Sequence, residues 1–66
     1  MHRDDAIAYA EKYQIPLGEN FHALGRDVVG RILDAANEHK YRRPVLANGS
    51  RARYFYYYLC RAARRA

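Results

Sequence analysis

Arginine and tyrosine are concentrated in the last 27 residues of the chain, and these two residue types are well suited to binding a charged partner. Arginine presents a planar guanidinium group that pairs with phosphate or carboxylate through two parallel hydrogen bonds. Tyrosine rings stack on exposed bases. The pattern predicts a surface that binds nucleic acid or a nucleoprotein complex. The candidate binding residues are Arg42, Arg43, Arg51, Arg53, Tyr54, Tyr57, Tyr58, Arg61, Arg64 and Arg65.

The formal net charge of +5 is divided unevenly along the chain. Residues 1–39 hold all seven acids and four cations, a net charge of −3, whereas residues 40–66 hold eight cations and no acid. This division favours a folded body that presents a cationic face to a partner. Two alternatives stay open. In the first, the acidic and the basic half neutralise each other, within a monomer or across a dimer. In the second, the cationic face binds no partner and is simply solvated, and its last arginines complement a helix dipole.

The other reactive side chains form no recognisable catalytic motif. His2, His22 and His39 lie far apart, and Cys60 has no histidine neighbour in the sequence. Metal sites on fingers or helix pairs need short, fixed spacings, and a phosphate loop needs clustered glycines. We therefore expect no enzyme activity, no metal, no cofactor and no small-molecule substrate. Cys60 is expected to be a half-buried structural residue.

The length of 66 residues allows one domain. Half of the residues are apolar, but 11 of these are alanine and only 11 are isoleucine, leucine or valine. Chains shorter than about 70–80 residues seldom stabilise themselves through one apolar core alone. A single cysteine allows no internal disulfide. A homodimer, or a monomer stabilised by a partner, is therefore expected.

The periodicity of apolar residues predicts an all-α domain of three helices, at about residues 4–14, 26–40 and 51–64. In the first helix, Ala6, Ile7, Tyr9, Ala10 and Tyr13 share one arc, and Pro16 ends the helix. The second helix has the broadest apolar arc, which we expect to form the centre of the core and of any dimer seam. That arc contains Val28, Val29, Ile32, Leu33, Ala35 and Ala36.

The last helix is expected to begin after Ser50, whose hydroxyl is suited to an N-cap. An anion site at this helix start is an equally weighted alternative to simple capping. On a helical wheel, Phe55, Tyr56 and Leu59 point inward, with Ala52, Ala62, Ala63 and Ala66 beside them. Tyr54, Tyr57 and Tyr58 fall on the opposite side among the arginines.

Two other architectures fit the sequence poorly. A strand over residues 54–59 would need an alternation of period two, which this segment lacks. A helix-turn-helix DNA reader joins its helices through a turn of about 3–4 residues. Here both expected connections, residues 15–25 and 41–49, are much longer.

The sequence also carries a prediction about location. No apolar run follows Met1 as in a secretory signal, and no stretch approaches the ~20 apolar residues of a membrane span. A lone cysteine is compatible with a reducing compartment. We expect a cytoplasmic protein without a membrane partner.

Two segments resemble a group of short bacteriophage and prophage proteins. They are Tyr41-Arg42-Arg43-Pro44, followed by ANGSRARYF at residues 47–55, and LGENFHAL at residues 17–24. The resemblance implies a small phage-encoded protein that binds one macromolecule inside a bacterial host, and it brings no catalytic motif. The alternatives to nucleic-acid binding are an inhibitor of a host defence or regulatory protein, such as an anti-CRISPR protein, and a structural component of the virion.

Overall fold

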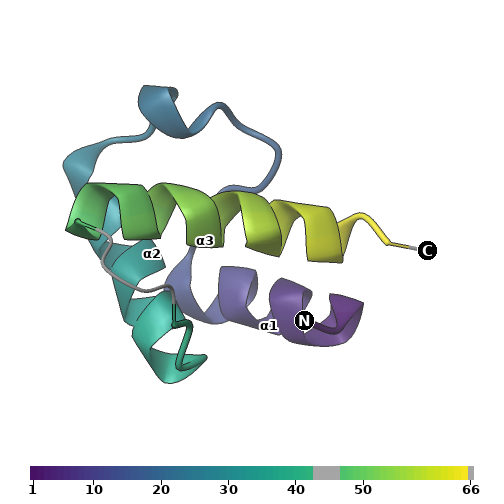
Figure 1. Cartoon of the computed structure of the whole chain (residues 1–66). Coiled ribbons are helices and arrows are strands. Elements are labelled where there is room, and N and C mark those ends of the chain that lie inside the picture. The colour runs from purple at the N-terminus through teal and green to yellow at the C-terminus, as the bar shows by residue number, and fades with distance from the viewer. Residues whose placement is uncertain (43–46, 66) are drawn as a thin grey trace.

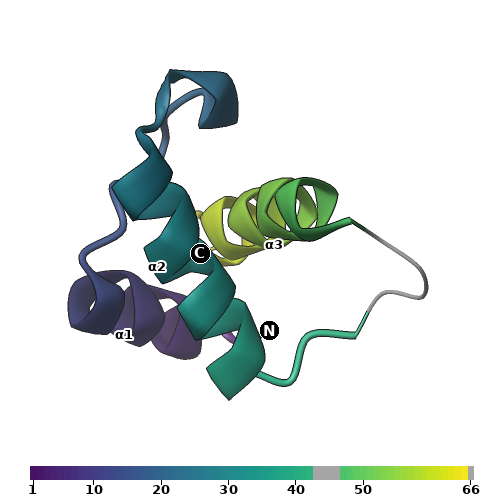
Figure 2. The ribbon, with the colours of Figure 1, turned by 90° about the vertical axis from the view of Figure 1, so that its left-hand side faces the viewer.

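Three α-helices, α1 (Arg3–Tyr13), α2 (Arg26–Glu38) and α3 (Asn48–Ala63), form the computed structural model, which describes residues 1–42 and 47–65. The predicted all-α fold is confirmed, and no strand occurs among these residues. Helices α1 and α3 pack side by side in opposite directions (Figure 1), and α2 crosses both (Figure 2). The Cα radius of gyration is 10.7 Å. A folded domain of this length has a radius of about 10.8 Å, so the helices are tightly packed.

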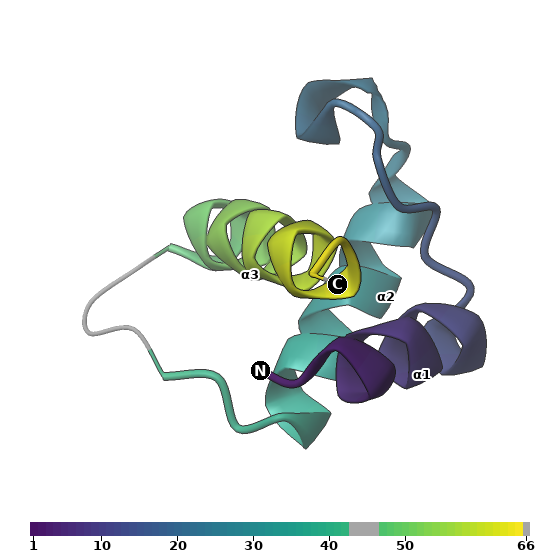
Figure 3. The same cartoon turned by 90° about the vertical axis from the view of Figure 1, so that its right-hand side faces the viewer.

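The connection between α1 and α2 contains one 3₁₀ turn, η1 (Phe21–Ala23), which stands above α3 (Figure 3). Asn20 caps this turn, because its side-chain oxygen accepts a hydrogen bond of 2.9 Å from the His22 backbone N–H. Phe21 is buried and Leu24 is half-buried. Both side chains therefore anchor the connection to the core.

Helices α1 and α2 end one and two residues earlier than predicted, at Tyr13 and Glu38. Gln14 and Lys40 adopt left-handed backbone conformations, with φ of 54° and 58°. The Ile15 N–H then donates to the Ala10 carbonyl, and the Tyr41 N–H donates to the Ala36 carbonyl, each at 2.9 Å. These bonds form Schellman motifs, which usually contain glycine at the left-handed position. They turn Ile15 and Tyr41 back towards the core.

The predicted start of α3 is wrong. The helix begins at Asn48, three residues earlier, and Ser50 lies inside the first turn instead of capping it. The Arg51 N–H donates to the Ala47 carbonyl at 2.9 Å, so the helical hydrogen-bond pattern already includes residue 47. Ala47 supplies no side-chain cap. The preference of serine for the N-cap position is therefore outweighed by the extension of the helix towards Asn48.

The core lies between the three helices, with α3 at its centre. Phe55, Tyr56 and Leu59 are fully buried, as predicted. Cys60 is 4% exposed, deeper than expected. The buried helix positions next to them are mostly small residues, which let the helix axes approach closely: Ala6 and Ala10 on α1, Ala35 and Ala36 on α2, Ala52 and Ala62 on α3.

The apolar arc of α2 is only partly covered. Ile32 is buried with Ala35 and Ala36, so this arc contributes to the core, but α3 and not α2 supplies most of the large buried side chains at its centre. Val28, Val29 and Leu33 are half-buried. Self-association through α2 stays a prediction. Among the described residues, no helix has the length and apolar character needed to cross a membrane.

Tyr56 ties α3 to the connection that follows α1. Its hydroxyl donates to the Pro16 carbonyl at 2.7 Å and accepts from the Glu19 N–H at 3.0 Å. Burial raises the pKa of this phenol from 10.0 to about 12. The folded protein therefore holds the Tyr56 proton more tightly than the unfolded chain does.

We expect Tyr56→Phe to lower the free energy of unfolding by about 1–3 kcal/mol at pH 8, because two hydrogen bonds are lost. Between pH 10 and pH 12 the wild type should lose stability that the variant cannot lose, since deprotonation of Tyr56 favours unfolding. The difference between the two proteins should therefore shrink over this range. Urea denaturation at several pH values measures it, and a difference that grows above pH 10 would contradict the assigned role.

Candidate nucleic-acid interface

One side of α3 and the residues just after it carry arginine and tyrosine. We call this the Arg/Tyr face, and it consists of exposed or half-exposed Arg53, Tyr54, Tyr57, Arg61, Arg64 and Arg65. An α-helix rises about 1.5 Å per residue, so the segment from Arg53 to Arg64 is about 16 Å long. Phe55 and Leu59 occupy the opposite, buried side. The helical wheel predicted this division.

The arginines of the Arg/Tyr face form no ion pair with a carboxylate in the described part of the chain. The ion pairs found there all use basic side chains from the first 31 residues, namely Arg3 with Asp4, Lys12 with Glu38, and Arg31 with Asp27, and the His2 ring also lies 4.0 Å from Asp4. Direct pairing between the acidic and the basic half of one chain is thus not seen among residues 1–42 and 47–65. The positive charge of α3 remains available to a partner.

The last arginines also suit their position in the helix. Arg61 lies in the last turn of α3, and Arg64 follows the helix directly. Cations near a helix C-terminus complement the helix dipole. A part of the arginine content therefore stabilises α3 itself, whereas Arg53, near the middle of the helix, does not have this role.

Tyr58 is less exposed than its place on the wheel predicts. It is half-buried, because the turn after α2 places Tyr41 over it. The two rings stack with centroids 5.6 Å apart and planes inclined by 30°. The Tyr58 hydroxyl also accepts a hydrogen bond of 2.6 Å from the Met1 amino group. This side chain belongs to the edge of the core as much as to the surface.

Arg51 also differs from a free surface cation. Its guanidinium donates to the Tyr41 carbonyl at 3.0 Å, which ties residue 41 to the start of α3. Arg42 is exposed, and Arg43 lies outside the described residues. Of the ten predicted site residues, the Arg/Tyr face therefore unites six.

A groove opens along the Arg/Tyr face. It has a volume of about 160 Å³ and is lined by Tyr41, Tyr54, Tyr57, Tyr58 and Arg61, which we call the tyrosine groove. Sites for drug-sized ligands occupy about 300–1,000 Å³, so this groove suits a single planar ring better than a whole cofactor. Tyr41 was not among the predicted site residues. In the sequence, the feature that could have indicated a role for Tyr41 in the site is its position next to Arg42 and shortly before Pro44.

A second groove of about 200 Å³ lies at the other edge of the Arg/Tyr face. It is lined by Gly18, Glu19, Asn20, Tyr57, Cys60 and Arg64. The Tyr57 hydroxyl accepts a hydrogen bond of 3.0 Å from the Phe21 N–H at this edge. Tyr57 is therefore held in place while 38% of it remains exposed.

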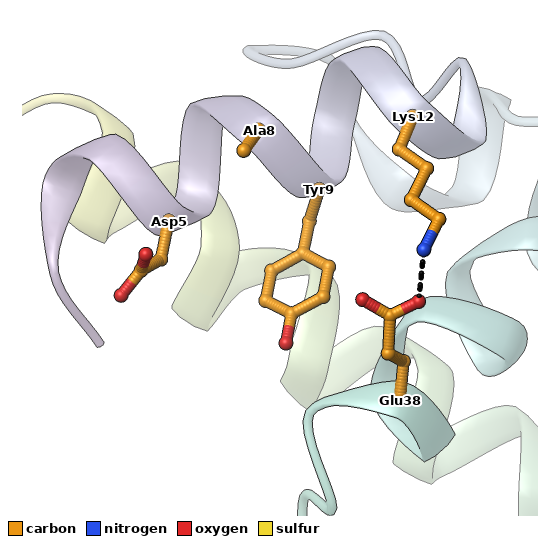
Figure 4. Close-up of a pocket in the computed structure, with 5 residues that line it drawn as sticks. All are labelled: Asp5, Ala8, Tyr9, Lys12 and Glu38. Carbon is orange, nitrogen blue, oxygen red and sulfur yellow. Dashed lines mark hydrogen bonds and ion pairs between the residues drawn. The ribbon is translucent and has the colours of Figure 1, made fainter.

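A further pocket lies away from the Arg/Tyr face, between α1 and α2 (Figure 4). It has a volume of about 220 Å³ and is lined by Asp5, Ala8, Tyr9, Lys12 and Glu38. The Lys12 ammonium lies 2.6 Å from Glu38 Oε1, which raises the pKa of Lys12 and lowers that of Glu38. The charges of Lys12 and Glu38 satisfy each other, and the other polar groups that line the pocket are the Asp5 carboxylate and the Tyr9 hydroxyl. No group of three potential metal ligands occurs among the described residues.

No family model matches this chain. Neither the curated proteins nor the solved structures contain a match to it. The resemblance to phage proteins stays a prediction from the sequence.

Proposed function

We propose that the protein is a small, non-catalytic, phage-encoded protein whose Arg/Tyr face binds nucleic acid, either free or within a nucleoprotein complex. The observation that carries this proposal is the set of arginines on one side of α3 that pair with no carboxylate in the described part of the chain. A cationic surface of this kind attracts the phosphate backbone and releases its counterions. The bacterial cytoplasm as its location and the homodimer expected from the sequence belong to the same proposal.

The spacing of the arginines supports binding to a strand. Arg53 and Arg61 are about 12 Å apart along the helix, and Arg64 follows Arg61 after less than one turn. Arg53 also lies over the Tyr54 ring, with 5.4 Å between the guanidinium carbon and the ring centroid. Four arginines, with Arg65, thus line one straight surface and can contact about four phosphates.

The salt dependence of binding tests this proposal. With about four phosphate contacts, the logarithm of the binding constant should fall with the logarithm of the salt concentration with a slope of about −2.8 for a single strand and about −3.6 for a duplex. The affinity should therefore drop about 50- to 150-fold between 50 mM and 200 mM salt. Fluorescence anisotropy with labelled oligonucleotides measures this slope. Binding that is independent of salt, or no binding at 50 mM, would overturn the proposal.

Failure of that test would favour an inhibitor of a host protein. Tyrosine and arginine are also the residues most enriched at the centres of protein interfaces. The Arg/Tyr face would then contact an acidic protein surface, and a stable complex with a purified host protein would be the decisive result.

A further inference from the structure

We infer that the tyrosine groove holds one unpaired base, which makes the partner a single-stranded nucleic acid. This inference rests on the proposed function and specifies the form of its partner. Four of the five residues that line the groove are tyrosines, and the fifth is Arg61. A nucleobase is a flat ring that stacks on aromatic side chains, whereas in a duplex its faces are already stacked on neighbouring pairs.

The groove is shaped by residues that cannot easily move. Tyr58 is stacked on Tyr41 and accepts a hydrogen bond at its hydroxyl, and Tyr57 accepts one from the Phe21 N–H. Arg51 holds the Tyr41 backbone against α3. Binding to such a surface loses little side-chain entropy, because the rings are already ordered. The groove is therefore a preformed platform.

The exposed rings are where a base would enter. Tyr54 is 46% exposed and Tyr57 is 38% exposed, and both line the groove. They lie three residues apart on α3, so they are neighbours on one face of the helix. The volume of about 160 Å³ limits the occupant to about one ring. A base between these tyrosines would meet an aromatic surface on more than one side.

The surrounding charges match the backbone of such a strand. Arg61 lines the groove itself, and Arg64 and Arg65 follow it along α3 and just beyond. Arg53 lies on the other side, against Tyr54. A strand that places one base in the groove therefore has arginines for its phosphates in both directions. This combination of stacking and flanking cations is typical of single-strand binding surfaces.

Anisotropy titrations with single-stranded DNA, single-stranded RNA and duplex DNA of equal length test the inference. We expect at least one single strand to bind about 5- to 150-fold more tightly than the duplex, which is the contribution of one stacked base. Preference for RNA over DNA would add a contact with the 2′-hydroxyl, and both outcomes support the inference. Equal or tighter binding of the duplex would overturn it and leave the proposed function intact. No binding to any of the three would overturn both.

A matched pair of variants locates the effect in the groove. Tyr54→Leu removes an aromatic ring and should lower single-strand affinity about 5- to 150-fold, with a clearly smaller effect on duplex affinity, which loses only the support that the ring gives to Arg53. Tyr54→Phe keeps the ring and should bind single strands like the wild type. Circular dichroism of both variants verifies that they are folded. A folded Tyr54→Leu variant with wild-type affinity for single strands would overturn the groove as the base site.

Discussion

Replacing Arg53, Arg61 and Arg64 together with glutamine should weaken nucleic-acid binding about 100-fold at 0.1 M salt and leave the protein folded, with a loss of stability of about 1 kcal/mol or less for each of Arg61 and Arg64, which no longer complement the helix dipole. Each phosphate contact with a single strand contributes about −0.7 to the slope of the logarithm of the binding constant against the logarithm of the salt concentration. Three contacts therefore contribute about −2.1, which corresponds to a factor of about 100 in affinity at 0.1 M salt relative to 1 M salt. The three guanidinium groups form no ion pair within the described chain, and the contact that the substitution breaks is that of Arg53 with the exposed Tyr54 ring. Anisotropy at several salt concentrations should show a slope that is smaller by about 2.

A second triple variant separates the position of the charge from its amount. Arg3, Lys12 and Arg26 are exposed cations of the acidic half, and replacing them with glutamine lowers the net charge by the same three units. If the Arg/Tyr face binds the partner, this control should keep most of the affinity. An equal loss in both variants would show that net charge alone attracts the nucleic acid, and the Arg/Tyr face would no longer be a defined site.

Phe55→Ala should remove most of the stability of the fold. The Phe55 ring is fully buried and contacts the rings of His39, Tyr41 and Tyr58, so its loss leaves a cavity where α2 and α3 meet. Such a change costs about 3–5 kcal/mol, whereas a chain of this length has a total stability of about 3–10 kcal/mol. Leu59→Ala, at a second fully buried position, should cost about 2–5 kcal/mol.

Thermal and urea denaturation, followed by circular dichroism, measure both losses. Tyr54→Ala is a suitable control, because it removes a ring of similar size from the neighbouring position, where 46% of the residue is exposed. Its cost should be clearly smaller than that of Phe55→Ala. If the arginine variant unfolds and the Leu59→Ala variant does not, the assigned inner and outer sides of α3 are reversed.

Much of this fold follows from local patterns in the chain. A period of 3.6 residues puts Phe55, Tyr56 and Leu59 on one side of α3 and the arginines on the other, wherever the helix packs. The charge division also follows directly from composition, since no acid occurs after Glu38. Both features were predicted from the sequence and agree with the structure.

The helix ends could not be predicted in the same way. Gln14 and Lys40 take a left-handed conformation that glycine usually occupies, and Ser50 is an N-cap residue that does not cap. At each of these positions the preference of the residue type for a backbone conformation or for a capping role amounts to only a small free energy. Packing of Ile15 or Tyr41 against the core, or one more helical turn, outweighs it.

The tyrosine groove is a product of the tertiary structure. Tyr41 lies on the turn after α2, more than ten residues before Tyr54, and only the packing of α2 against α3 brings their rings together. The hydroxyl partners of Tyr56, Tyr57 and Tyr58 lie 36–57 residues away in the sequence. Periodicity within one helix states which side chains face the core or the solvent. It contains no information on contacts between distant segments, which depend on how the helices pack.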